Sequence, residues 1–308
     1  MTKNEIISVL SDVDDFVWDL YFLNINKKRK NPYVVDNVKF KSTDNLNKYA
    51  KDLLDSVIKF QVEPISGVQV YNGENPKVTC DTLSLESHLI NQNWKLFYNA
   101  VSEAGTGKIK GKIHGYFLTG RNPNDEGGKS ITLFKCANPV LQFSKNKIAV
   151  YRFIRNDELD SIQDVFCRLY LSSDFIIYDN TLYSFNCNFE KIFDMDKTIA
   201  KIRENCMNTI SNLDVFSNNS DFIKHGKEYK SSRTFIALNP KRIAGIKDNK
   251  QRKKIAKMLD IALDENGKFI VDDDVKAAKL IKYICYKIFQ EADTKDVLEA
   301  SSITKISQ

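Results

Sequence analysis

Hydrophobic positions recur at two different periods along the chain, which predicts a mixture of helices and strands. The most regular helical stretch is 43–58, where apolar residues recur at three- and four-residue intervals, the spacing of one helix face. Further helices are expected at 85–102, 189–212 and 272–291. Alternation of apolar and polar residues predicts strands at 16–23, 33–40, 62–72, 131–134, 140–143, 147–154, 174–178 and 181–186.

The order of these elements favours an α+β fold. Helices and strands do not alternate regularly, as the units of a parallel sheet would. The Asp179-Asn180 pair between the last two strands is typical of a tight antiparallel hairpin. We therefore expect a mixed, largely antiparallel sheet in the second half with flanking helices. A composition shift near 120–130 predicts an N-terminal α+β domain over 1–125 and a C-terminal α+β domain over 126–308.

Composition excludes several classes of protein. The 308 residues are 42% hydrophobic and 28% charged, as in ordinary globular proteins, and no apolar run approaches the roughly 18 residues of a transmembrane helix. The six cysteines never form a Cys-x-x-Cys pair, so neither a zinc ribbon nor a disulfide framework is expected. The first 25 residues lack the basic start and apolar block of a signal peptide, so a cytoplasmic location is expected.

The net charge of +6 comes from one segment. Residues 224–257 contain twelve Lys and Arg but only two acidic residues, Glu228 and Asp248. Several cations on one surface can hold nucleic-acid phosphates, because each contact releases condensed counterions. Tyr229 and Phe235 lie among them and could stack on bases. The predicted nucleic-acid-binding residues are Lys224, Lys227, Lys230, Arg233, Lys241, Arg242, Lys250, Arg252, Lys253 and Lys254.

The arrangement and the partner of these cations stay open. If residues 224–233 are one helix, their four cations recur at every third residue and share a stripe. No recognisable reading helix is present, so DNA would be bound non-specifically through its backbone. The same charges could instead form a solvated face, or meet a membrane or an acidic protein. In the last two cases the protein would be an adaptor.

Catalysis has weaker support in the sequence. The glycine-bearing loop 105–115 lacks the Gly-x-x-x-x-Gly-Lys-Ser/Thr spacing of a phosphate-binding loop. A metal-dependent nuclease could use Asp174 or Asp179 with Glu190, but Glu190 is directly adjacent to Lys191, and neighbouring residues point to opposite faces of a strand. The three histidines are isolated. We therefore predict a binding protein with no catalytic residues, no metal ligands and no cofactor.

Residues 174–193 predict a hairpin that leads into the helical segment Phe-Glu-Lys-Ile-Phe. Over about residues 130–215 the chain resembles the Kiwa KwaB-like family of bacterial antiphage defence proteins, and its length and late basic segment are compatible with that family. The resemblance implies a DNA-binding effector that obstructs phage DNA transactions. It also implies a small KwaA-like membrane partner that recruits the protein to the inner face of the membrane. A homo-oligomer is expected from the frequency of twofold symmetry among oligomers.

Overall fold

The chain packs as two compact units. The computed structural model describes residues 1–40, 42–73, 78–105, 113–124, 130–136, 140–141, 151–155, 158–161, 166–167, 169–285, 287–291, 293–294 and 296–299. The first unit comprises residues 1–68 and 77–193, and the second comprises 69–76 and 194–308. The boundary expected at 125/126 falls inside the first unit, between two strands that pair as neighbours, β5 (Gly115–Arg121) and β6 (Ile131–Lys135). It therefore does not coincide with the division by packing.

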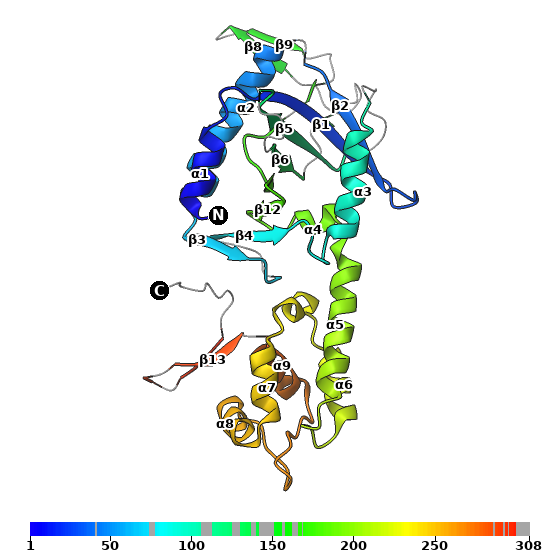
Figure 1. Ribbon diagram of the computed structural model, residues 1–308, viewed down its shortest axis with the longest axis vertical. Coiled ribbons are helices and arrows are strands. Elements are labelled where there is room, and N and C mark those ends of the chain that lie inside the picture. Colours follow the sequence, from blue (N-terminus) through cyan, green and yellow to red (C-terminus); the bar gives the residue numbers. More distant parts are fainter. Residues whose placement is uncertain are drawn as a thin grey trace. The chain divides into compact units, whose positions relative to one another are not determined.

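An eight-stranded sheet forms the centre of the first unit (Figure 1). Its order is β2-β1-β5-β6-β11-β12-β4-β3, and pairing is antiparallel from β2 through to β4. The α+β class is thus confirmed, although the sheet takes strands from both halves of the chain. The remaining strands are β1 (Val17–Ile25), β2 (Tyr33–Val38), β3 (Gly67–Val70), β4 (Thr79–Ser84), β11 (Phe175–Tyr178) and β12 (Thr181–Ser184).

One face of this sheet is covered by two helices. α1 (Lys3–Ser11) and α2 (Thr43–Val57) pack their apolar sides on it, and the five-residue π-helix η1 (Ile58–Val62) continues α2. The helices contact the strand residues that point to this face, including Leu20, Leu118 and Leu133. The predicted helix at 43–58 is therefore confirmed, because its regular apolar spacing matches a buried face.

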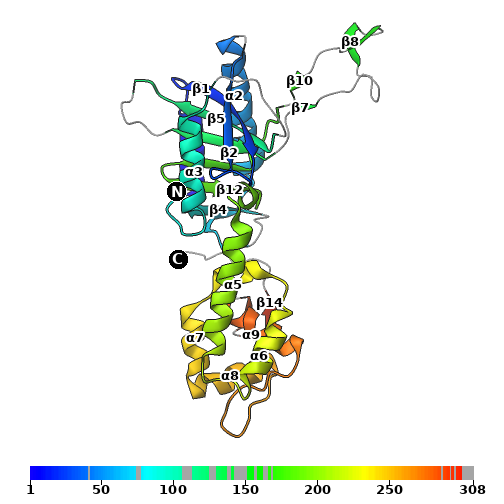
Figure 2. The ribbon, with the colours of Figure 1, turned by 90° about the vertical axis from the view of Figure 1, so that its right-hand side faces the viewer.

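α3 (Asn91–Ser102) and α4 (Phe189–Ile192) lie on the opposite face (Figures 1 and 2). A row of aromatic rings also lies on this face. Tyr21, Phe117, Phe134 and Phe175 stack across four neighbouring strands, with successive ring centroids 4.9, 5.3 and 4.6 Å apart. Phe97 of α3 contacts the middle two rings. Stacked and edge-on aromatic pairs of this kind add to the stability that burial provides.

Some expected elements lie only partly within the described residues. The strands predicted at 140–143 and 147–154 correspond to β7 (Val140–Leu141) and β8 (Tyr151–Arg155), which pair with β10 (Phe166–Cys167) and β9 (Glu158–Ser161). Residues 106–112 of the glycine-bearing loop, with Lys108, Lys110 and Lys112, lie outside the described residues.

The second unit is mostly helical. Its central helix is α9, which packs against α6, α7 and α8. The core between the helices includes Phe222, Phe235, Ile246, Phe269 and Ile281, all buried. The elements are α5 (Met195–Ser211), α6 (Asn219–Lys227), the 3-10 helix η2 (Ser232–Ala237), α7 (Pro240–Lys247), α8 (Asn249–Leu259), α9 (Asp274–Ile284), β13 (Ile288–Gln290) and β14 (Val297–Glu299).

Candidate nucleic-acid interface

Helix α8 divides the basic segment into a buried face and an exposed face. Asp248 caps its N-terminus by accepting a hydrogen bond from the Gln251 amide at 2.7 Å, and Asp260, in the left-handed conformation with φ +55°, ends it. The buried positions are Arg252, Ile255, Ala256 and Leu259. The exposed face carries a lysine stripe, defined here as Lys250, Lys253, Lys254 and Lys257. Both sets follow the i, i+3, i+4, i+7 spacing of one helix side.

The charge of the lysine stripe is not neutralised locally. None of its four ammonium groups forms an ion pair with a residue that the structure describes. Acidic groups of this unit pair with other lysines: Asp214 with Lys268 at 2.5 Å, Asp272 with Lys276 at 2.5 Å, and Glu299 with Lys282 at 2.7 Å. The stripe therefore presents four cations to solvent along about 10 Å of helix.

Arg252 has a different role from its neighbours. It is 7% exposed, and its Nε donates a hydrogen bond to the Gly267 carbonyl at 2.7 Å. Its Nη1 donates to the carbonyls of Ile246 at 3.1 Å and Lys247 at 3.4 Å. These two carbonyls end α7, where helix geometry leaves acceptors without intrahelical partners. Arg252 thus stabilises the fold and does not belong to the exposed cationic surface.

The two predicted residues of α7 differ in the same way. Lys241 is exposed in the first turn, where Asn239 caps the helix by accepting from the Lys241 amide at 2.9 Å. Arg242 is half-buried, with its guanidinium carbon 4.2 Å from the centroid of the Tyr283 ring. Such a contact holds the cation by attraction to the ring face. Lys241 remains a candidate for phosphate contact, and Arg242 attaches α7 to α9.

The four cations at 224–233 do not form a single helical stripe. Helix α6 ends at Lys227, so Lys224 and Lys227 lie on α6, Lys230 lies in a loop and Arg233 lies on η2. All four side chains are exposed. The predicted basic segment is therefore divided among α6, η2, α7, α8 and the loop that holds Lys230.

The aromatic residues of the segment are core or partly buried. Phe235 is 1% exposed, and its ring meets Tyr229 edge-on with centroids 6.1 Å apart. The Tyr229 hydroxyl lies 3.1 Å from the Thr234 hydroxyl. Base stacking on Phe235 was therefore wrongly expected, because its ring packs in the core of the second unit.

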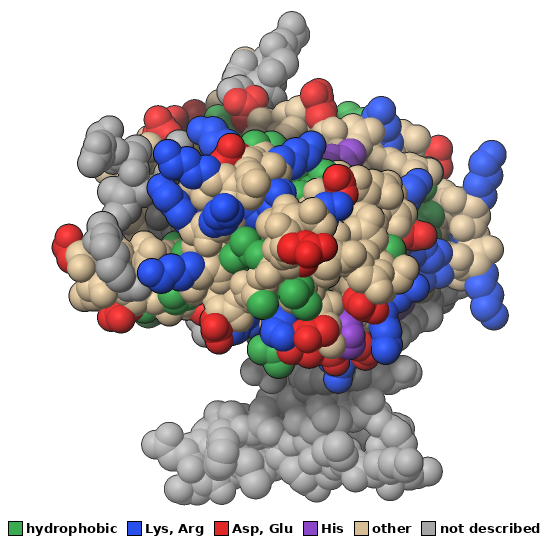
Figure 3. Space-filling model, turned by 90° about the horizontal axis from the view of Figure 1, so that it is seen from below, with side chains coloured by type: hydrophobic (Ala, Val, Ile, Leu, Met, Phe, Trp, Pro, Cys, Tyr) green, Lys and Arg blue, Asp and Glu red, His purple; other side chains and the backbone are tan. Residues whose placement is uncertain are grey.

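Lys and Arg side chains are numerous on the surface seen from below. Some of them cluster at the upper left, and others lie along the right side among acidic side chains (Figure 3). The predicted residue set omitted Lys257 and Lys247, both of which are exposed. Lys257 could have been found from its spacing to Lys250, Lys253 and Lys254.

The carboxylates of the nuclease alternative lie in the first unit. Asp174 is 3% exposed and accepts hydrogen bonds from the Cys136 amide at 2.7 Å and from Asn186 Nδ2 at 2.8 Å, with Lys135 Nζ at 3.2 Å. Burial alone would raise the pKa of Asp174, but these hydrogen bonds and the Lys135 charge together lower it. Glu190 is buried on α4, at 1% exposure. Within the described residues, no group of three or more His, Cys, Asp or Glu could hold a metal.

Comparison with known proteins connects these features to a family. The family model described as Kiwa protein KwaB-like matches residues 125–286, which is more than half of the 308-residue chain. That range runs from the strands β6, β11 and β12 to α9 and includes the lysine stripe. No curated protein and no solved structure matches the chain.

The described helices were also compared with the requirements for a transmembrane helix. None of them is both long enough and apolar enough to span a bilayer. On the family match, the chain belongs to the Kiwa protein KwaB-like family, and this membership implies a role in antiphage defence.

Proposed function

We propose that the protein binds DNA non-specifically through the phosphate backbone and thereby obstructs phage DNA transactions. The observation that carries this proposal is the lysine stripe of α8, with four exposed side chains and no ion pair to a described residue. Four cations along about 10 Å of helix are comparable in density to one DNA strand, with one phosphate per roughly 3.4 Å. The proposal includes a KwaA-like membrane partner, which family membership supports.

The stripe favours backbone contact over base reading. Lysine is a flexible point charge with no planar fork to match a base edge, and backbone contacts position a protein without carrying sequence information. Lys241 at the start of α7 is a further exposed cation of the predicted set. Affinity should therefore depend strongly on salt and weakly on sequence.

The test measures fluorescence anisotropy of a random 30-base-pair duplex at several salt concentrations. Each phosphate contact contributes about −0.9 to the slope of log K against log salt. Replacing all four stripe lysines by glutamine, which has a similar helix propensity, should make the slope less steep by about 3.6. If the four lysines make four phosphate contacts, raising the salt from 50 to 200 mM should weaken DNA binding by wild type about 150-fold more than DNA binding by the variant.

The matched control removes the same number of charges from the first unit. Lys39, Lys48, Lys51 and Lys95 are exposed there, and their replacement by glutamine should leave the slope close to that of wild type. Equal slopes for the stripe variant and wild type, with circular dichroism unchanged, would remove the stripe from the interface. No binding of any duplex by wild type at low salt would sink the proposal.

The same samples separate the alternatives. Tighter binding to anionic vesicles than to DNA would replace DNA by a lipid surface and make the protein an adaptor. Incubation of the duplex with Mg²⁺ or Mn²⁺ tests for a nuclease, and cleavage that disappears in Glu190→Gln would add catalysis to binding.

A further inference from the structure

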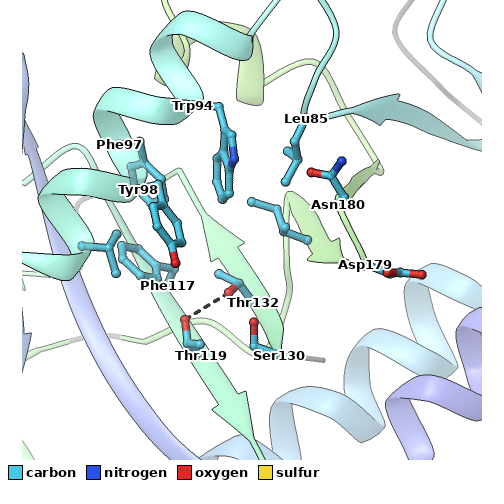
Figure 4. Close-up of a pocket in the computed structure, with 12 residues that line it drawn as sticks. Leu85, Trp94, Phe97, Tyr98, Phe117, Thr119, Ser130, Thr132, Asp179 and Asn180 are labelled. Atoms are coloured by element: carbon cyan, nitrogen blue, oxygen red, sulfur yellow. Dashed lines mark hydrogen bonds between the residues drawn. The ribbon is translucent and has the colours of Figure 1, made fainter. Parts of the chain in front are cut away.

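A pocket of about 490 Å³ opens on the α3 face of the first unit (Figure 4). It lies where α3 leaves part of the sheet uncovered. Twelve helical residues span about 18 Å, whereas eight strands spaced by about 4.8 Å extend across roughly 34 Å. The next row of sheet residues beyond the stacked aromatic rings therefore becomes the floor of the pocket. Its volume is in the range of small-molecule sites, roughly 300–1,000 Å³.

One wall of the pocket is aromatic. Trp94, Phe97 and Tyr98 of α3 stand side by side (Figure 4), with Trp94 centroids 5.6 Å from Phe97 and 6.2 Å from Tyr98. Tyr98 is 60% exposed, which is unusual for a large aromatic side chain and gives a ligand access to the wall. Such rings attract the face of another flat ring.

The floor opposite this wall is polar and uncharged. Thr119 and Thr132 are cross-strand neighbours on β5 and β6, and their hydroxyl oxygens lie 3.0 Å apart. One hydroxyl donates to the other, so the pair retains one donor and further acceptor capacity toward the pocket. Ser130 lies beside them (Figure 4).

The third side comes from the β11–β12 turn. Asn180 has φ +58° in this turn, and its carbonyl accepts from the Leu85 amide at 3.0 Å, so Leu85 and the Asn180 carboxamide lie together at the edge of the pocket. The Asp179 carboxylate points away from the floor (Figure 4). Among the described lining residues there is no Lys, Arg or His, so this part of the pocket offers no cation to a phosphate.

We infer that this pocket binds a nucleobase or nucleoside. An aromatic wall selects a flat ring, and the two threonines, Ser130 and Asn180 supply uncharged donors and acceptors like those that pair with the edge of a base. A hydrocarbon ring would leave these polar groups unpaired, which disfavours it. The described lining residues include no cation, which favours the base or nucleoside over its phosphate esters. The inference is independent of DNA binding by α8, since all lining residues belong to the first unit.

The test uses the fluorescence of Trp94. Trp18 is the only other tryptophan and is buried on the opposite face, so Trp18→Phe leaves a single reporter in the pocket wall. Titration with adenosine, guanosine, cytidine and thymidine should give saturable quenching by at least one, with a dissociation constant on the order of 100 µM. Its 5′-monophosphate should bind no more tightly. The titration extends to about 5 mM nucleoside, roughly 50 times the expected dissociation constant. If no nucleoside gives saturable quenching over this range, the inference is overturned.

Two variants test the pocket itself. Thr119→Val with Thr132→Val keeps the side-chain shape and removes both hydroxyls, and should weaken binding about tenfold. If the double variant does not fold, Tyr98→Ala, which removes an exposed ring from the pocket wall, takes its place as the pocket variant. Thr209→Val in the second unit is the control and should bind as the parent does. Unchanged affinity in a folded pocket variant, or a monophosphate that binds over tenfold more tightly than its nucleoside, would contradict the assignment.

The source of the base is resolved by two further arms. A short oligothymidylate tests a base in a single strand, and thymidine tests a free nucleoside. Binding of either that is lost in the pocket variant supports the inference and identifies the source. The stripe variant of α8 should bind the nucleoside as wild type does, which separates failure of this inference from failure of DNA binding.

Discussion

Replacing Arg252 by methionine should destabilise the second unit, whereas the same replacement of Lys253 should not. Methionine keeps an unbranched apolar side chain and a similar helix propensity, so the change removes mainly the cationic group. At Arg252 it removes hydrogen bonds of 2.7 Å to the Gly267 carbonyl and 3.1 Å to the Ile246 carbonyl, and a weaker one of 3.4 Å to the Lys247 carbonyl.

The size of the effect follows from these bonds. A hydrogen bond from a charged donor contributes about 1.5–3 kcal/mol, so the two shorter bonds give about 3–6 kcal/mol. Removing a buried guanidinium also removes its desolvation cost, which offsets part of the loss. We expect Arg252→Met to lower the free energy of unfolding by about 2–4 kcal/mol. Lys253→Met, at an exposed position, should change it by no more than about 0.5 kcal/mol.

Urea unfolding followed by circular dichroism at 222 nm measures this difference. The helices α5 to α9 dominate the second unit, whereas both tryptophans lie in the first unit and would report on that unit instead. With a slope of about 2 kcal/mol per molar urea, Arg252→Met should lower the midpoint by about 1–2 M. The reasoning is refuted if Arg252→Met and Lys253→Met unfold at the same midpoint.

Two other predictions concern the first unit. In Gly120→Ala, the new methyl group would lie 2.4–2.6 Å from three ring atoms of Trp18, so overpacking should cost about 1–3 kcal/mol and shift tryptophan emission; unchanged stability and emission would show that the ring has room to move. Asp174→Asn should abolish a stability contribution that is present at neutral pH. Burial opposes ionisation of Asp174, but Asn186, the Cys136 amide and Lys135 lower its pKa in the folded protein. The contribution is therefore present above the unfolded pKa of about 3.9, and it is lost as pH falls from that value through the folded pKa. The stability difference between wild type and variant should therefore shrink below pH 4, and a difference that is constant from pH 7 to pH 3 would contradict this.

Local sequence patterns predicted the existence of individual helices better than the residues at which these helices begin and end. The helix expected at 189–212 is interrupted, because Asp194 adopts φ +46° and separates α4 from α5. The helix expected from 85 begins at Asn91, since residues 84–90 form turns whose carbonyls accept from amides three residues on. Both interruptions preserve the apolar spacing, so periodicity alone does not reveal them.

The sheet could not be predicted as a whole from the sequence. β4 pairs with β12, about 100 residues further along the chain, and β5 and β6 pair across the expected domain boundary. Pairing at such separations depends on tertiary packing and leaves no local signal. The pocket has the same origin, because the Thr119–Thr132 floor and the α3 wall meet only after the sheet has formed.

The basic segment shows why charge along a sequence cannot by itself define a binding surface. Arg252 and Lys253 are adjacent and carry the same charge, yet successive positions on a helix differ by about 100°. One therefore points into the core, where carbonyl acceptors compensate its burial, and the other points to solvent. The two sets of positions on α8 lie on different sides of the helix and differ in composition. One side has three apolar residues and one cation, at 252, 255, 256 and 259, and the other has only lysine, at 250, 253, 254 and 257. A cation on the same helix side as the apolar residues is buried and stabilises the fold, whereas a cation on the other side is exposed and available to a partner.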